Sequence, residues 1–177
     1  MGLAYLTLDE TIRRYMLDEI NLDAANGDFI IGKRLNATGQ MRWLPLLKEA
    51  VASHNDDWLA ERQRSEHLIK PKESRRLKNG NVIEVDVPIT AAETLAEGEF
   101  NRFYIRGICR RAIESGISAV LVYRAKAVEN PRSASETLIG TTVDAQVLLA
   151  DLRTHQGEEP ALKMPGGPNS GLSVRLP

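Results

Sequence analysis

The sequence has little of what usually carries chemistry. A single cysteine, Cys109, excludes an internal disulfide, and the three histidines are scattered through polar stretches. No histidine belongs to an HExxH pair or to another metal-ligand spacing, so we expect no metal site. The 177 residues also lack the glycine-rich phosphate-binding loops and the GxSxG turn of hydrolases. The sequence therefore indicates no particular reaction, and we expect no cofactor.

Long hydrophobic runs are missing as well. No apolar run approaches the roughly 18 residues that a membrane-spanning helix needs. The first 16 residues lack the basic start and apolar stretch of a secretory signal. The net charge of −1 excludes a polycation as a whole, and 42% apolar and 27% charged residues are typical of globular chains. We expect a soluble cytoplasmic protein with no membrane contact.

Hydrophobic periodicity divides the chain into three parts. Residues 1–69 repeat their apolar positions at helical spacing and predict a helical N-terminal section, with a short strand candidate at 29–31. Residues 70–155 predict a β-hairpin, a βαβ core and a last helix. Residues 156–177 are rich in glycine and proline and predict an extended C-terminal arm. The expected class is α/β, with α+β as the alternative.

The hairpin is the most specific of these predictions. Asn79-Gly80 is a strong hairpin-turn signal. After it, Ile83, Val85 and Val87 alternate with acidic residues, so residues 82–87 predict a half-buried strand paired with the polar stretch 73–78. A helix over 91–115 and a buried strand at 119–124 follow. This strand–helix–strand order predicts that strands 82–87 and 119–124 are parallel.

Positive charge is concentrated in blocks. Residues 61–80 carry seven basic and three acidic side chains, a net of +4, and residues 101–132 carry seven and two, a net of +5. Within the second block, Arg102, Arg106 and Arg110 are spaced four apart and fall on one stripe of the 91–115 helix. The aromatic residues and Cys109 occupy the opposite side, which makes Cys109 an ordinary buried cysteine. We expect a row of exposed guanidinium groups on this helix.

Three like charges in one row repel one another, so the stripe needs compensation. Acidic neighbours, a polyanion such as DNA or RNA, or a protein partner would each supply it. The hairpin has the same alternatives: Lys72, Arg75, Arg76 and Lys78 could follow a nucleic-acid backbone, or could protect an edge strand against aggregation.

Two further stretches are candidate binding sites. Arg124, Lys126, Arg132, Ser133 and Ser135 lie where a buried strand ends, a place where α/β sheets often bind ligands. They could hold an anion, although no glycine-rich cradle accompanies them. In the C-terminal arm, Leu172, Val174 and Leu176 alternate, which suits a strand added to a sheet edge in its own domain or in a neighbour.

Contacts, and not chemistry, are the function that this pattern favours. We expect a non-catalytic interaction protein, a subunit of a larger protein assembly, with a protein partner or self-association. The first alternative is a nucleic-acid-binding protein that uses the arginine stripe and the basic hairpin. The second is an enzyme of unrecognised class with an anion site between Arg124 and Ser135.

Overall fold

The structure is a computed structural model that describes residues 2–129, 133–155, 162–165 and 170–177. In chain order its elements are α1 (Glu10–Asn26), α2 (Ala37–Ser53), α3 (Asp56–Ser65), β1 (Lys72–Arg76), β2 (Val82–Asp86), α4 (Ala91–Glu114), β3 (Ala119–Arg124), α5 (Ser133–Glu136), β4 (Thr142–Asp144), α6 (Ala145–Thr154) and β5 (Leu172–Arg175). The expected mixture of helix and strand is confirmed, but residues 29–31 form no strand.

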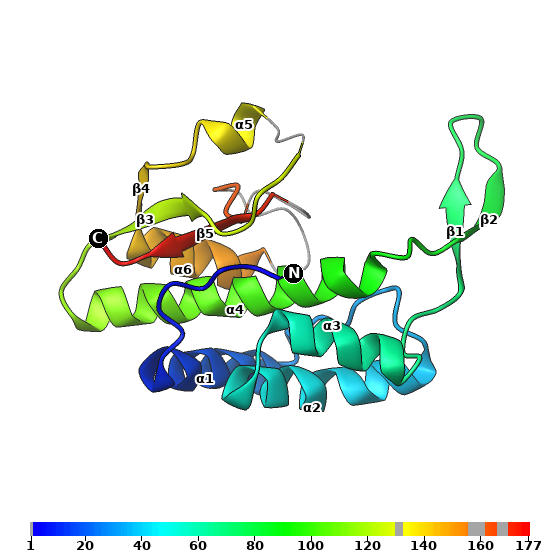
Figure 1. The fold of residues 1–177 in the computed structure, drawn as a ribbon, viewed down its shortest axis with the longest axis horizontal. Coiled ribbons are helices and arrows are strands. Elements are labelled where there is room, and N and C mark those ends of the chain that lie inside the picture. The colour runs from blue at the N-terminus through cyan, green and yellow to red at the C-terminus, as the bar shows by residue number, and fades with distance from the viewer. Residues whose placement is uncertain (1, 130–132, 156–161, 166–169) are drawn as a thin grey trace.

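Helix α4 runs through the middle of the molecule (Figure 1). Helices α1, α2 and α3 lie on one side of it, and α6 and the sheet of β4, β3 and β5 lie on the other. It is continuous through Gly98, and it ends beside Gly116 at φ +72°. One hydrophobic cluster joins both sides around it.

Local signals explain where several helices begin and end. The side chains of Asp9, Asn36 and Asn55 cap α1, α2 and α3 by accepting a hydrogen bond from a backbone N–H in the first turn. Gly27 ends α1 at φ +76°, as Asn26-Gly27 predicts. Gly107 allows α1 and α4 to approach closely, because a Cβ there would lie 3.2 Å from the Ile12 carbonyl oxygen.

The predicted hairpin is present, but the predicted βαβ core is wrong. β1 pairs antiparallel with β2, with Arg75 opposite Ile83 and Lys72 opposite Asp86. β2 does not join the second sheet, whose order is β4-β3-β5 and whose pairings are all antiparallel. The helix α4 therefore connects strands of two separate sheets. The order of elements cannot reveal this, because a strand–helix–strand sequence specifies a parallel pair only when both strands share a sheet.

The C-terminal strand belongs to the protein's own core. β5 pairs with β3, with Val174 opposite Val122, and Leu172, Ser173 and Val174 are fully buried. Asn101 of α4 donates a hydrogen bond to the Leu172 carbonyl (2.8 Å) and accepts one from the Ser173 hydroxyl (2.7 Å). The expected addition to a sheet edge is correct, and the sheet is the chain's own. Residues 156–161 and 166–169 of the predicted arm lie outside the described residues.

Among the described residues, no helix is both long enough and apolar enough to cross a membrane.

Candidate interaction arm and the buried arginine network

Two of the three arginines predicted to form an exposed stripe are buried. Arg106 has no exposed surface and Arg102 is 8% exposed, while the side chain of Arg110 is 26% exposed. The expectation of an exposed guanidinium row is therefore wrong. The helix is covered on both sides, by α1 below and by α6 above, so an arginine on its back still faces protein.

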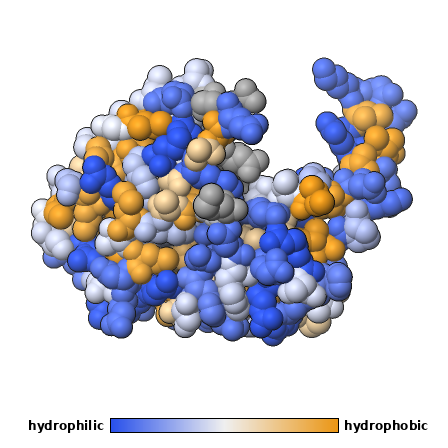
Figure 2. Space-filling model, viewed as in Figure 1, coloured by the Kyte–Doolittle hydropathy of each residue, from blue (hydrophilic) through white to orange (hydrophobic). Residues whose placement is uncertain are grey.

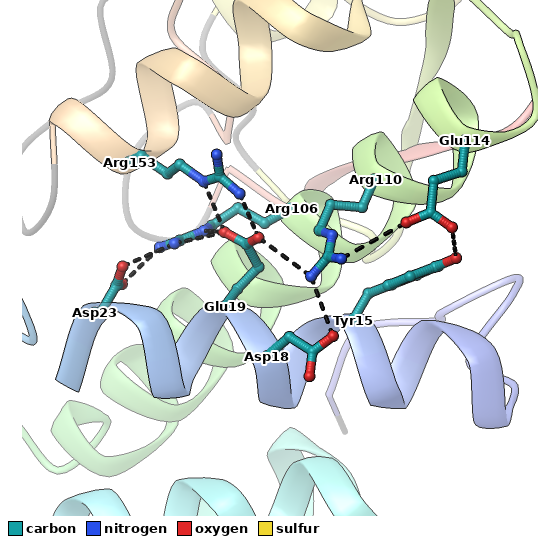
Figure 3. A network of polar contacts seen from close by, with 8 residues as sticks. All are labelled: Tyr15, Asp18, Glu19, Asp23, Arg106, Arg110, Glu114 and Arg153. Atoms are coloured by element: carbon teal, nitrogen blue, oxygen red, sulfur yellow. Dashed lines mark hydrogen bonds and ion pairs between the residues drawn. The ribbon is translucent and has the colours of Figure 1, made fainter. Parts of the chain in front are cut away.

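Carboxylates of α1 neutralise Arg106 (Figure 3). Its two Nη atoms donate to the carboxylate oxygens of Asp23 at 2.6 and 2.8 Å, and its Nε donates to Glu19 Oε2 at 2.9 Å. Arg153 of α6 reaches the same Glu19 carboxylate with Nε at 2.9 Å and Nη2 at 2.5 Å. Glu19 therefore joins three helices through two guanidinium groups.

The electrostatics of Glu19 follow from this arrangement. Burial alone would raise its pKa, but the hydrogen bonds from Arg153 and the attraction of Arg106 outweigh burial, so the pKa of Glu19 is lowered. Arg110 lies at the edge of the same network, with Asp18 at 3.2 Å and Glu114 at 3.6 Å. Among the described residues, the acidic residues just before the stripe in sequence supply only Glu99, which lies 3.8 Å from Arg102. The carboxylates that neutralise Arg106 lie on α1, more than 80 residues away in sequence.

The proposed anion cluster is neutralised from within. Arg124 pairs with Glu136 and donates to the Ser170 carbonyl (3.0 Å), and Lys126 pairs with Glu97. Ser135 is buried, Ser133 is exposed, and Arg132 lies outside the described residues. The sequence places Arg124 and Lys126 at a strand end correctly. Their positive charges are neutralised by Glu136 and Glu97, so they are not left to bind an anion.

Cys109 is buried in the core. Burial raises the pKa of the Cys109 thiol to about 12, which leaves it protonated and unreactive.

A small cleft lies on another part of the molecule. It has a volume of about 460 Å³ and lies between the N-terminal segment and the α2–α3 junction, with the His54 ring stacked 4.2 Å from that of Trp58. Arg13 also lines this cleft, and its guanidinium donates a hydrogen bond to the Val51 carbonyl at 2.6 Å and so caps the end of α2.

Asp56, close to this cleft in sequence, is a buried carboxylate that sequence reasoning missed. Its Oδ2 accepts a hydrogen bond from the Leu3 N–H (3.0 Å), and its Oδ1 has no hydrogen-bond partner among the described residues. Burial raises the pKa of Asp56 to about 6. No sequence pattern signals it, because acidic residues in the first turn of a helix are usually exposed. Among the described residues, no group of three metal-ligating side chains gathers.

The β1–β2 hairpin is different from all of these sites, because it projects from the body (Figures 1 and 2). We call residues 72–86 the arm. It rises from one end of α4 and stands apart from the body, with hydrophobic residues along it and hydrophilic residues at its tip. Its base is held to the body. Arg34 donates two hydrogen bonds to Glu73 through Nε and Nη2, both at 2.7 Å, and the Lys70 N–H donates to the Arg34 carbonyl.

The register gives the arm two unlike faces. Residues opposite one another share a face, so Glu73, Arg75, Ile83 and Val85 lie together, and Leu77 continues this side. This apolar face exposes 40% of Ile83 and 38% of Leu77 to solvent. The other face carries Lys72, Ser74, Arg76, Glu84 and Asp86, with Val82 at the distal end. The sequence predicts the alternation correctly, but the expected half-burial is incomplete because the body does not cover the strand.

Comparison with known proteins supplies no further constraint. No family model matches the chain, and no curated protein and no solved structure shows significant similarity to it.

Proposed function

We propose that the chain is a non-catalytic interaction protein, a subunit of an assembly in which the apolar face of the arm packs against a second copy of the chain. The observation that carries this proposal is the strip of the exposed Leu77 and Ile83 and the partly buried Val85 on a two-stranded sheet held away from the body. Two isolated strands are marginally stable in water, so an arm of this kind gains from a further layer.

A second copy fits this strip for a simple reason. A two-fold contact places the same patch of both subunits against each other, so one apolar strip satisfies both arms without any other complementary surface. The well-anchored base supports the same conclusion, because the bidentate pair of Arg34 and Glu73 holds the arm in an extended position before any partner arrives. The neutralised anion cluster and the protonated Cys109 favour contacts over chemistry.

Light scattering after size-exclusion chromatography tests the proposal with a pair of matched variants. The wild-type mass should rise toward twice 19.6 kDa with concentration. Ile83→Asp, on the apolar face, should keep the protein at the monomer mass. Val82→Asp is the control, because it introduces the same charge one residue away on the opposite face, where 66% of Val82 is exposed, and should leave assembly unchanged.

Two outcomes would overturn the proposal. One is a wild-type mass of 19.6 kDa at every concentration up to several hundred micromolar. The other is an equal effect of the two aspartate variants, which would show that the apolar face is not the contact.

A further inference from the structure

The charge of the arm is segregated along its length. Residues 72–86 carry four basic and three acidic side chains, a net of +1, which leaves −2 on the rest of the chain. All three acidic residues, Glu73, Glu84 and Asp86, lie in the half of the arm nearer the body. The distal half, residues 75–83, contains Arg75, Arg76 and Lys78 and no acidic residue.

These distal cations are not neutralised as the arginines of the body are. Ten arginines of the described chain lie within ion-pair distance of a carboxylate: Arg34, Arg42, Arg62, Arg64, Arg102, Arg106, Arg110, Arg111, Arg124 and Arg153. Within the part of the chain that the structure describes, Arg75, Arg76 and Lys78 belong to no such pair. The distal half of the arm therefore holds three cations with no ion-pair partner among the described residues and no acidic residue, and it is the part of the hairpin farthest from the body.

We propose that the distal half of the arm binds the phosphate backbone of a nucleic-acid duplex by entering its groove. A two-stranded β-ribbon fits the major groove, which is about 12 Å wide and about 8.5 Å deep. Three residue pairs beyond Glu84, at about 3.3 Å per residue, extend about 10 Å, so the acid-free half matches the depth of the groove.

Guanidinium groups supply the chemistry that recognises phosphate. Arg75 and Arg76 can donate paired hydrogen bonds to phosphate oxygens, and Lys78 adds a point charge at the tip. Arg76 lies on the face opposite the apolar strip and Lys78 lies in the turn, so these two remain available if the strip packs against a second copy. Arg75 shares the face of the strip, so it adds the third phosphate contact in the monomer. The net negative body would be repelled by the duplex, so contact is limited to the arm. A two-stranded ribbon is a shape that the major groove admits, which favours a duplex over a flat acidic protein surface.

Fluorescence anisotropy with a labelled 20-base-pair duplex tests the inference on the full chain. Each neutralised phosphate contributes about −0.9 to the slope of log affinity against log salt, so three contacts predict about −2.7. Affinity should then fall about 40-fold between 50 and 200 mM salt. Changing Arg75, Arg76 and Lys78 together to Gln should abolish measurable binding at 50 mM salt.

Two controls separate charge at the arm from charge elsewhere. Changing Arg14, Lys33 and Lys48 to Gln removes the same charge from the body and should leave binding within twofold. Replacing Arg75 and Arg76 by Lys keeps the charge and should retain most of the affinity and the salt slope. Circular dichroism should be unchanged in each variant, because no distal side chain contacts the core.

The outcomes also distinguish this inference from the proposed assembly, on which it does not depend. Absence of duplex binding at 50 mM salt, or an equal loss in the body variant, would overturn it even if the arm mediates assembly. Conversely, arm-dependent binding by a protein that stays monomeric would support it and refute the assembly. Binding of an acidic polypeptide such as polyglutamate with equal affinity would also overturn it, because the groove would then play no part.

Discussion

Replacing Arg106 by methionine should destabilise the protein severely although it removes no hydrophobic contact. Arg106 is completely buried, and its partner Asp23 is 2% exposed. Once the guanidinium is gone, Glu19 keeps Arg153, but the Asp23 carboxylate remains buried without a cation. Breaking a buried pair in this way costs about 3–5 kcal/mol, because the remaining charge is not solvated.

Arg110→Met is the matched control, since it lies one turn farther along the same stripe of α4. Its side chain is partly exposed, and its partners Asp18 and Glu114 are about half exposed. Water can solvate these carboxylates when the arginine is lost. The third partner, the buried Glu19 at 3.7 Å, keeps Arg106 and Arg153 when Arg110 is lost. The expected cost is therefore about 0–1 kcal/mol.

A double substitution isolates the cause. Arg106→Met together with Asp23→Leu removes both buried charges, so it should be more stable than Arg106→Met alone by about 2 kcal/mol or more. If the loss came from packing at Arg106, the second substitution would add to the damage.

Urea denaturation followed by circular dichroism provides the measurement. With a dependence of about 2 kcal/mol per molar urea, a loss of 4 kcal/mol lowers the midpoint by about 2 M. Equal midpoints for the Arg106 and Arg110 variants would refute the reasoning, because the two positions would then have the same environment.

Three further predictions concern other buried groups. Burial raises the pKa of Asp56 from 3.8 to about 6, so the free energy of unfolding should fall by about 3 kcal/mol as pH rises from about 3 to about 7. Asp56→Asn should remove this fall, and urea midpoints that keep the wild-type pH dependence would contradict it. Cys109, with its pKa raised to about 12, should react with a thiol reagent only in denaturant, and rapid native labelling would contradict its burial. Ending the chain after residue 170 removes Leu172 and Val174 from the core, at about 1.5–3 kcal/mol each, so the melting temperature should fall by about 10 °C or more, while removing Pro177 alone should not change it.

The arm is structurally separate from the hydrophobic core of the described chain. Its removal would leave the hydrophobic cluster intact, because that cluster draws on the helices and on the sheet of β4, β3 and β5. We therefore expect the arm variants to change binding and assembly without unfolding the protein, which makes the arm experiments interpretable.

Local patterns determined several features of this protein by themselves. Asn79-Gly80 between alternating strands predicts the hairpin, and Gly80 takes the positive φ of its turn (+88°). The register, with Arg76 opposite Val82 and Leu77 bonded to Asn81, is one that the dipeptide alone does not specify. Glycine at position 27 determines where α1 ends, since a left-handed conformation suits it. Helical periodicity places Cys109 in the core, and the alternation of Leu172 and Val174 marks β5 as a strand for a sheet edge.

Tertiary structure alone decided where each of these elements lies and which charges are neutralised. Arg106 and Arg76 are both arginines in basic stretches, yet one is enclosed by Glu19 and Asp23 and the other projects into solvent. The difference depends on contacts between residues more than 80 positions apart, and a local pattern contains no information about them. For the same reason the sequence predicted a parallel partner for β3, whereas the actual partners, β4 and β5, come from later in the chain. Periodicity specifies which face of an element is apolar, but only packing shows what covers the opposite face.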